Sequence, residues 1–199
     1  GEKLSREKAV LGFYVSGHPL RKFALEIAAF ANAQLGNPAS VKAGSLVRVC
    51  GIISGVKKKI DKKGNMMAFL TLEDFTGKGE CIVFSDPYRQ FQHQLVPDAM
   101  VMVTGNAEQN GDSLRIIVKE ALPMDQVRER FAKRVILSIH LKDLQEQTVQ
   151  ALRAVAEKHK GKCTCLFDII EEGPAKSVQM QSTKYVIDAS DAFISEVEG

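Results

Sequence analysis

The order of short alternating segments between residues 45 and 120 constrains the fold more than any other feature of this chain. The first segment places Val47 and Val49 on one side and Arg48 and Cys50 on the other, which is the period of a β-strand. Four more strand-like segments follow, with one short helical segment between the third and the fourth. We therefore expect a small closed sheet of five strands.

The remaining segments complete this order. Residues 67–74, 79–84, 101–108 and 114–119 read as strands, and a helix of about two turns begins at Asp86-Pro87. The last two strands form a hairpin across Asn110-Gly111-Asp112. Three strands, a helix and two strands is the order of an OB-fold, a barrel whose second and third strands and adjoining loops bind oligonucleotides.

The first strand leads into a lysine-rich segment. Gly51 and Gly55 interrupt it, which indicates a bulge or a sharp bend. Between Val56 and Gly64 the only acid is Asp61, so the local charge is +4, and the predicted loop carries Lys57, Lys58, Lys59, Lys62 and Lys63. Two interpretations remain open: a solvated loop kept soluble by its lysines, or an electrostatic track for the phosphates of a single strand.

Two further residues complete the predicted nucleic-acid site. Arg48 and Phe69 lie on adjoining strands and are predicted to supply a cation and a stacking platform beside the five lysines. Alternation alone does not decide whether Phe69 faces the core or the solvent. No catalytic residue and no metal ligand are predicted, because no paired carboxylates, glycine-rich phosphate loop or nucleophile–base pair stands in a supporting context.

The chain divides into three predicted parts. Residues 1–40 are a helical lead-in, with one helix near residues 7–15 and a second carrying Leu20, Phe23, Ile27 and Ala31 on one face; residues 41–122 are the OB-fold domain. Residues 123–199 form a connecting helix and a small α+β domain. That domain is predicted to contain strands over 134–141, 162–170 and 177–187 and helices over 143–160 and 190–198.

The C-terminal domain carries two local predictions. Asp143 and Glu146 have the spacing of a capping box, and Gly161 is expected to end the same helix. From Leu166 onward the chain contains seven acidic residues and two lysines, which gives a net charge of −5. This acidity argues against nucleic-acid contact there and favours a protein partner or a plain surface.

Several phrases are similar to one family. Residues 7–20, EKAVLGFYVSGHPL, resemble the segment that precedes the OB domain in bacterial DNA polymerase III alpha subunits, and the similarity continues over residues 49–57, 63–74 and 123–131. Residues 71–77, TLEDFTG, also resemble the anticodon-binding OB domains of class II aminoacyl-tRNA synthetases. The first resemblance covers most of the chain up to about Arg134 and disfavours a tRNA-binding module.

The polymerase resemblance implies a role. It implies a non-catalytic part of a cytoplasmic DNA-directed DNA polymerase, a nucleotidyltransferase whose active-site acids lie upstream of this segment. The OB-fold would hold single-stranded template DNA, and the tail would dock replisome proteins, namely the clamp-loader tau subunit and, through neighbouring segments, the sliding clamp. A purely protein-binding scaffold of the replisome is the other function that remains open.

Composition excludes several classes of protein. There is no signal peptide and no apolar run of about 18 residues, so no membrane association is expected, and the missing initiator Met suggests a segment of a longer protein. The four cysteines, at positions 50, 81, 163 and 165, form no CxxC motif, which favours buried thiols in a reducing compartment over a shared zinc site. No cofactor is expected.

Overall fold

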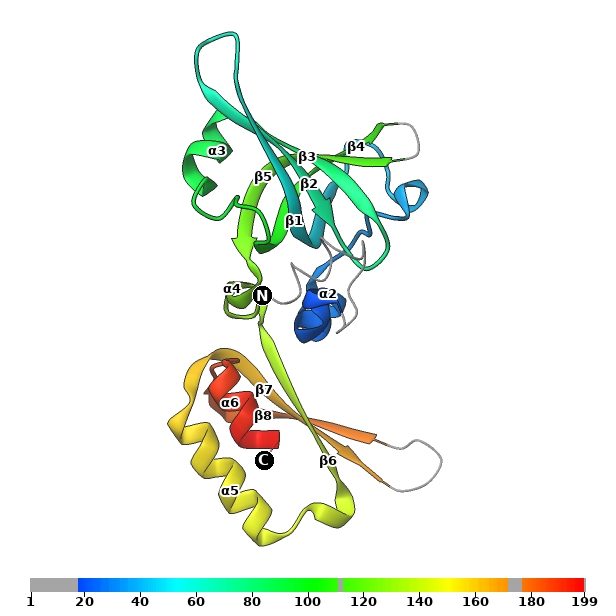
Figure 1. Ribbon diagram of the computed structural model, residues 1–199. Helices are drawn as coiled ribbons and strands as arrows, with labels where there is room; N and C mark the ends of the chain where they lie inside the picture. Colours follow the sequence, from blue (N-terminus) through cyan, green and yellow to red (C-terminus); the bar gives the residue numbers. More distant parts are fainter. Residues whose placement is uncertain (1–17, 111–112, 172–176, 199) are drawn as a thin grey trace. The chain divides into compact units, whose positions relative to one another are not determined.

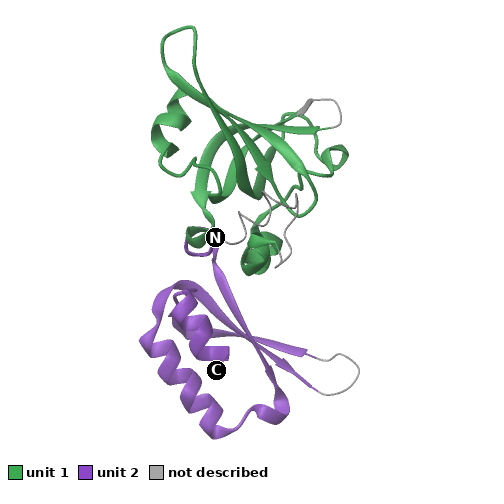
Figure 2. Ribbon diagram, viewed as in Figure 1, with its two compact units in different colours: residues 1–127 green, residues 128–199 purple. Residues whose placement is uncertain are grey.

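The computed structural model describes residues 18–110, 113–171 and 177–198, and the chain divides into two compact units, residues 1–127 and 128–199 (Figure 2). The helix predicted near residues 7–15 lies outside the described residues. The described lead-in contains three short helices, η1 (Pro19–Phe23), α2 (Ala24–Phe30) and η2 (Pro38–Ser40). The single helix predicted to carry Leu20, Phe23, Ile27 and Ala31 on one face is instead divided between η1 and α2, and Ala31 lies beyond the end of α2. Leu20 is fully buried, but the buried residue of α2 is Glu26.

The first unit contains a closed barrel with the strand order β1-β2-β3-β5-β4 (Figure 1). Strands β3 and β5 pair in parallel, and the other neighbouring strands pair antiparallel. The strands are β1 (Leu46–Ile60), β2 (Met66–Glu73), β3 (Lys78–Val83), β4 (Met100–Asn110) and β5 (Ser113–Pro123), and helix α3 (Ser85–Phe91) connects β3 to β4. The predicted five-stranded OB-fold is confirmed.

The barrel core follows from alternation along each strand. Inward-facing residues are apolar and almost fully buried, so each strand contributes every second side chain to one cluster. These residues include Val47, Val49, Ala68, Leu70, Leu72, Cys81, Val83, Leu114, Ile116 and Val118. Tyr88 of α3 joins the same cluster and fixes the helix against the barrel.

The two glycines of β1 have different roles. The register to β2 shifts between Ile53, which opposes Leu72, and Gly55, which opposes Thr71, so Ser54 is the extra residue of a bulge directly before Gly55. Gly51 instead pairs regularly with Val101. A Cβ at position 51 would lie 2.6 Å from Cγ of Leu72, so glycine is needed there for close packing rather than for a bend.

Hydrogen bonds join the lead-in, at Phe30 and Asn32, to the first half of β1. The Asn32 backbone N–H donates to the carbonyl of Arg48 (3.1 Å), and the Asn32 side-chain oxygen accepts from the Arg48 backbone N–H (2.7 Å). The Arg48 Nε also donates to the carbonyl of Phe30 (2.8 Å). The first half of β1 pairs with β4 along one edge, and these bonds occupy its other edge.

The turn between β2 and β3 holds the lead-in at a second place. One carboxylate oxygen of Asp74 accepts from the Leu35 backbone N–H (2.8 Å), while the other accepts from the backbone N–H groups of Thr76 (2.7 Å) and Gly77 (2.9 Å). The Gly36 backbone N–H donates to the Thr76 hydroxyl (2.9 Å). The Asp74–Gly77 part of the TLEDFTG phrase therefore has a structural role in this chain.

The second unit is a three-stranded sheet with two helices. The sheet has the order β6-β7-β8, with β6 and β7 parallel and β7 and β8 antiparallel. The chain runs through α4 (Met124–Phe131), which contains the boundary between the units, then β6 (Arg134–His140), η3 (Leu141–Asp143), α5 (Glu146–Lys158), β7 (Lys160–Ile170), β8 (Ser177–Ile187) and α6 (Asp191–Glu198). Its core contains Ala156, Cys165, Ile187 and Phe193.

Both local predictions for α5 are wrong. The N-cap residue is Gln145, without a side-chain cap bond, because Asp143 belongs to the preceding turn η3. The helix ends at Lys158, and Gly161 already lies in β7. A Cβ at Gly161 would lie 2.4 Å from the backbone nitrogen of Asp188, so this glycine permits close strand packing rather than a helix end.

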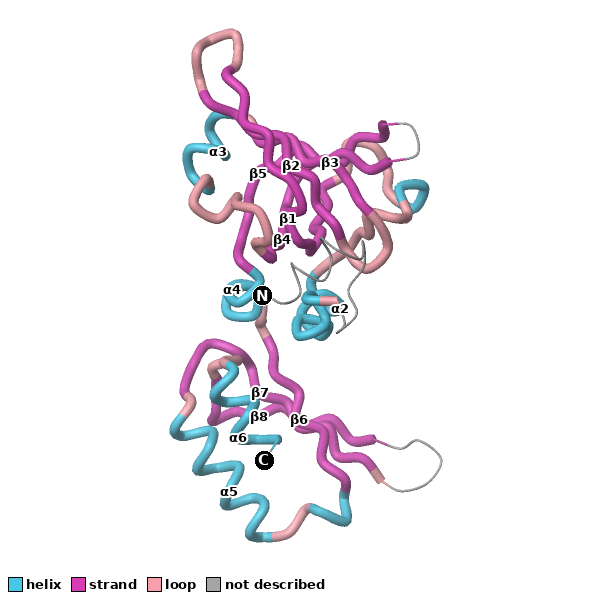
Figure 3. The backbone as a smooth tube through the Cα atoms, viewed as in Figure 1, coloured by secondary structure: helices cyan, strands magenta, loops and turns pink. Residues whose placement is uncertain are grey.

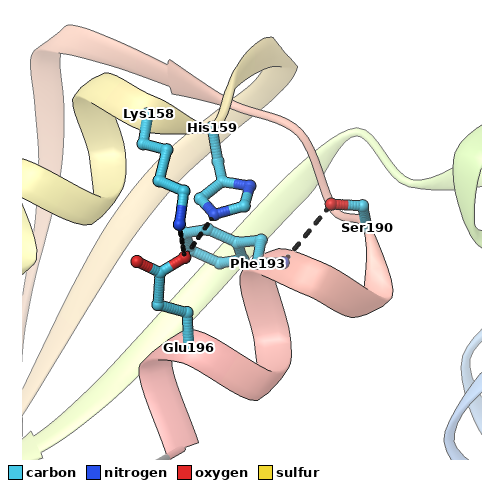
Figure 4. A network of polar contacts seen from close by, with 5 residues as sticks. All are labelled: Lys158, His159, Ser190, Phe193 and Glu196. Atoms are coloured by element: carbon cyan, nitrogen blue, oxygen red, sulfur yellow. Dashed lines mark hydrogen bonds and ion pairs between the residues drawn. The ribbon is translucent and has the colours of Figure 1, made fainter.

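Helices α5 and α6 are joined by a polar cluster at the end of α5 (Figure 4). Glu196 of α6 accepts from Lys158 Nζ (2.8 Å) and lies 2.7 Å from His159 Nε2. The His159 ring also meets the ring of Phe193 edge-on, with centroids 5.7 Å apart. The hydrogen bonds from Lys158 and His159 hold the pKa of Glu196 below its usual value, Lys158 being the larger influence.

Candidate nucleic-acid interface

The predicted lysine loop is largely a strand. Lys57, Lys58 and Lys59 belong to β1 and oppose Phe69, Ala68 and Met67 of β2, so β1 and β2 form a two-stranded ribbon that extends from the barrel (Figure 3). The connecting turn contains only residues 61–65. The expectation of a loop over residues 57–63 is corrected accordingly, because the ladder to β2 continues as far as Ile60 and Met66.

The turn is organised around Asp61. Its carboxylate accepts from the backbone N–H groups of Asn65 and Lys63, each at 2.8 Å, and these bonds hold the pKa of Asp61 below its usual value. Gly64 adopts a φ of +84°, which favours glycine. All five lysines are exposed to solvent, so their charges remain available to a ligand.

Pairing along the ribbon separates the lysines by face. Because successive strand residues point to opposite faces, Lys57 and Lys59 share the outer face with Phe69, the cross-strand neighbour of Lys57. Lys58 opposes Ala68, a core residue, and therefore points to the opposite side, toward α3.

Phe69 faces outward. Its neighbours Ala68 and Leu70 belong to the core cluster, whereas Phe69 is half-buried and directly opposes Lys57 on one side and Ile82 on the other. The question that alternation left open is thus answered: a cation and an aromatic ring lie side by side on the outer surface of the barrel.

The same face contains residues that the sequence analysis did not assign to the site. Ile82 opposes Ile117 of β5, which extends the outer row from Lys57 and Phe69 across two more strands. Phe84, at the end of β3, is half exposed and lines a hollow of about 670 Å³ together with Ile117 and Asn106. Alternation grouped Phe84 with Ile82 and could have identified it, had the outward face of β3 been known.

Arg48 lies apart from this row. It opposes Thr104 on β4, and along β1 it is separated from Lys57 by about 30 Å of strand at about 3.3 Å per residue. Its guanidinium donates to the carbonyl of Phe30, which gives Arg48 a role in holding the lead-in. Contact of Arg48 with nucleic acid stays a prediction.

The cysteines are buried thiols. Burial raises the pKa of Cys50 and of Cys81 to about 12, so neither is a ready thiolate ligand or nucleophile. Within the described ranges, no group of three or more His, Cys, Asp or Glu side chains is arranged to hold a metal ion. Likewise, none of the described helices has the length and apolar character needed to cross a membrane.

Two family models match the chain, one in each half. Residues 47–124 match the OB-fold nucleic acid binding domain, and residues 135–199 match the C-terminal domain of the DNA polymerase III alpha subunit. The first match covers the barrel strands, and the second covers the three-stranded sheet with its helices.

Curated relatives match nearly the whole chain. DNA polymerase III subunit alpha of Pseudomonas fluorescens is 30% identical over 195 residues, covering 97% of this chain and 16% of the relative. The subunit from Escherichia coli O157:H7 is 23% identical over 199 residues, covering 98% of this chain and 17% of the relative. The chain thus spans about a sixth of the length of these relatives.

Among solved structures, a mitochondrial single-stranded DNA binding protein from S. cerevisiae covers 41% of this chain and 96% of its own, with 19% identity and a TM-score of 0.34. That score is too low to bear on function, and the fold rests on the barrel itself. Sequence similarity therefore identifies the family. Over nearly all of its length, the chain is related to the C-terminal region of bacterial DNA polymerase III alpha subunits, which comprises the OB domain and the C-terminal domain.

Proposed function

We propose that the barrel binds single-stranded template DNA and guides it within a replicative, DNA-directed DNA polymerase. The observation that carries this proposal is the outer row, in which Lys57 opposes Phe69 and apolar side chains continue across β3 and β5. A cation beside a ring matches the two needs of a single strand, neutralisation of phosphates and stacking of bases. The match of residues 47–124 to a nucleic-acid-binding OB family supports it.

The surface favours a single strand over a duplex. Stacking on Phe69 and Phe84 requires bases that are splayed from a helix, whereas duplex readout uses an element that enters a groove. The half-exposed Phe84 and the neighbouring Ile117 offer such a stacking surface. The segment would act in the cytoplasm, where bacterial replication takes place, and its parent would supply the nucleotidyl transfer.

The second unit is proposed to dock replisome proteins. Within it, Ile136, Val178, Met180 and Val186 are each about half exposed or more, which suits a protein partner better than a nucleic acid. The clamp-loader tau subunit is the partner implied by the family resemblance, and the sliding clamp would be reached through neighbouring segments. In the scaffold alternative, this docking would be the only role.

The proposed function is tested by fluorescence anisotropy with labelled oligothymidylate at two salt concentrations. We expect binding that weakens as salt rises, with about 0.7 in the slope of log affinity against log salt per phosphate contact. Unlabelled tRNA as a competitor separates the anticodon-binding alternative from the template-binding one. Absence of single-strand binding at low salt would leave the scaffold role.

A further inference from the structure

A polar hollow of about 500 Å³ lies on the other side of the lysine ribbon, between its turn and α3. Lys58 and Arg89 line it together with hydrogen-bonding groups of Asn65, Ser85 and Gln92. None of these residues except Lys58 belongs to the site predicted from the sequence. The hollow is thus a second place on the barrel where cations and donors converge.

The fold dictates why these residues meet. Lys58 occupies an inward-facing position of β1, but the barrel has already ended there, so its side chain is exposed toward α3. Buried Tyr88 fixes α3 against the core and places its neighbour Arg89 at the rim of the same hollow. The two cations therefore come from elements that are held separately, β1 by its ladder to β2 and α3 by the packing of Tyr88.

The acids near the hollow leave both cations available. Asp86 lies 3.7 Å from Arg89, but the pair is 89% and 72% exposed, respectively, and such surface pairs contribute little. The carboxylate of Asp61 already accepts two backbone N–H groups of its own turn. An anion would find two positive charges and several neutral donors there.

We propose that this hollow is a phosphate subsite formed by Lys58 and Arg89, with Asn65, Ser85 and Gln92 as neutral donors. Two cationic side chains together with neutral hydrogen-bond donors suit a phosphate group, which accepts charge-assisted hydrogen bonds through several oxygens. As far as that phosphate belongs to a nucleic-acid strand, the inference rests on the proposed function. The strand would then straddle the ribbon, with Lys57 and Lys59 on one face and Lys58 on the other.

The first test measures oligothymidylate binding to the intact chain with Lys58→Gln, Arg89→Gln and, as a control, Arg21→Gln, which removes one exposed charge from the lead-in of the same unit. Each subsite variant should lower the salt slope by about 0.7, so its binding deficit should shrink about 2.5-fold between about 50 and about 200 mM salt. The control should leave the slope unchanged. If the wild type binds but both subsite variants behave like the control, the subsite is overturned and the proposed function stands.

The second test uses inorganic pyrophosphate alone and separates a free phosphate from a strand phosphate. Amide resonances of Gly64, Asn65, Ser85 and Arg89 should shift together on titration, and Arg89→Gln should abolish these shifts. Such shifts in a chain that binds no oligothymidylate would support the subsite and overturn the proposed function. Absence of shifts, together with wild-type DNA binding by Lys58→Gln and Arg89→Gln, would overturn the subsite.

Discussion

At the scale of single residues, Phe69 offers the sharpest test because its neighbour in the same strand points the other way. Phe69→Ala should weaken oligothymidylate binding by about 1–3 kcal/mol, as expected for a stacking residue. The folding cost should be about 1–2 kcal/mol, because the ring is only partly buried on the outer face. Anisotropy and urea unfolding measure the two effects separately.

Leu70→Ala is the matched control. Leu70 is almost fully buried in the barrel core, so its truncation should cost about 2–5 kcal/mol of folding. At temperatures where the variant remains folded, its DNA affinity should be near that of the wild type. A large folding loss in Phe69→Ala with unchanged DNA affinity would show that Phe69 is a packing residue.

The sequence could not predict the position of every side chain, because some residues lie in stretches without a hydrophobic pattern. Residues 66–72 are apolar on both faces apart from Thr71, so alternation could pair Phe69 with Met67 but could not say which face is buried. The role of Asp74 was hidden for another reason. Its partner Leu35 is distant in sequence, and a carboxylate bonded to a remote backbone N–H leaves no local signal.

At the scale of elements, the order of the barrel strands was readable because each strand alternates and the breaks carry glycine, proline or asparagine. The length of β1, in contrast, could not be read from the sequence. A run of three lysines has no alternation, so residues 57–59 resembled a loop, and only pairing with β2 makes them a strand. The same limit applies to α5, where a capping-box spacing at Asp143 fell on a separate turn.

The ribbon makes an element-scale prediction. Replacing Lys57, Lys58, Lys59, Lys62 and Lys63 with Gln should weaken single-strand binding, and loss of three phosphate contacts would flatten the salt slope by about 2. Thermal stability should change little, because all five side chains are exposed. Lys22→Gln with Lys78→Gln is the control, since these exposed lysines lie outside the ribbon. An unchanged slope in the five-lysine variant would favour the scaffold function.

The polar cluster of Lys158, His159 and Glu196 between α5 and α6 gives a second prediction at the scale of elements. The lowered pKa of Glu196 means that its contribution is present above its unfolded pKa, about 4.5, and is lost as pH falls through the lower folded value. Glu196→Gln should therefore speed hydrogen exchange in α6 at pH 7, and wild type and variant should converge at pH values below the folded pKa. Glu198→Gln, a neighbouring exposed acid, is the control. Equal exchange in the wild type and Glu196→Gln at pH 7 would show that the cluster does not hold α6.

At the scale of the whole molecule, charge differs between the two halves. Residues 1–133 carry nineteen Lys or Arg and fourteen Asp or Glu, a net +5, whereas residues 134–199 carry eight and ten, a net −2. Because like charges repel, the acidic half should not attract a strand, and strand binding should depend on the basic half.

Truncation after Lys133 tests this division, since the barrel core contains only residues of the first unit and α4 is retained whole. The truncated chain should bind oligothymidylate with unchanged affinity and salt slope. Circular dichroism should show that its barrel remains folded. At low salt, where screening is weakest, loss of the net −2 should tighten binding slightly. Loss of binding by a folded, truncated chain would instead place part of the single-strand site in the second unit.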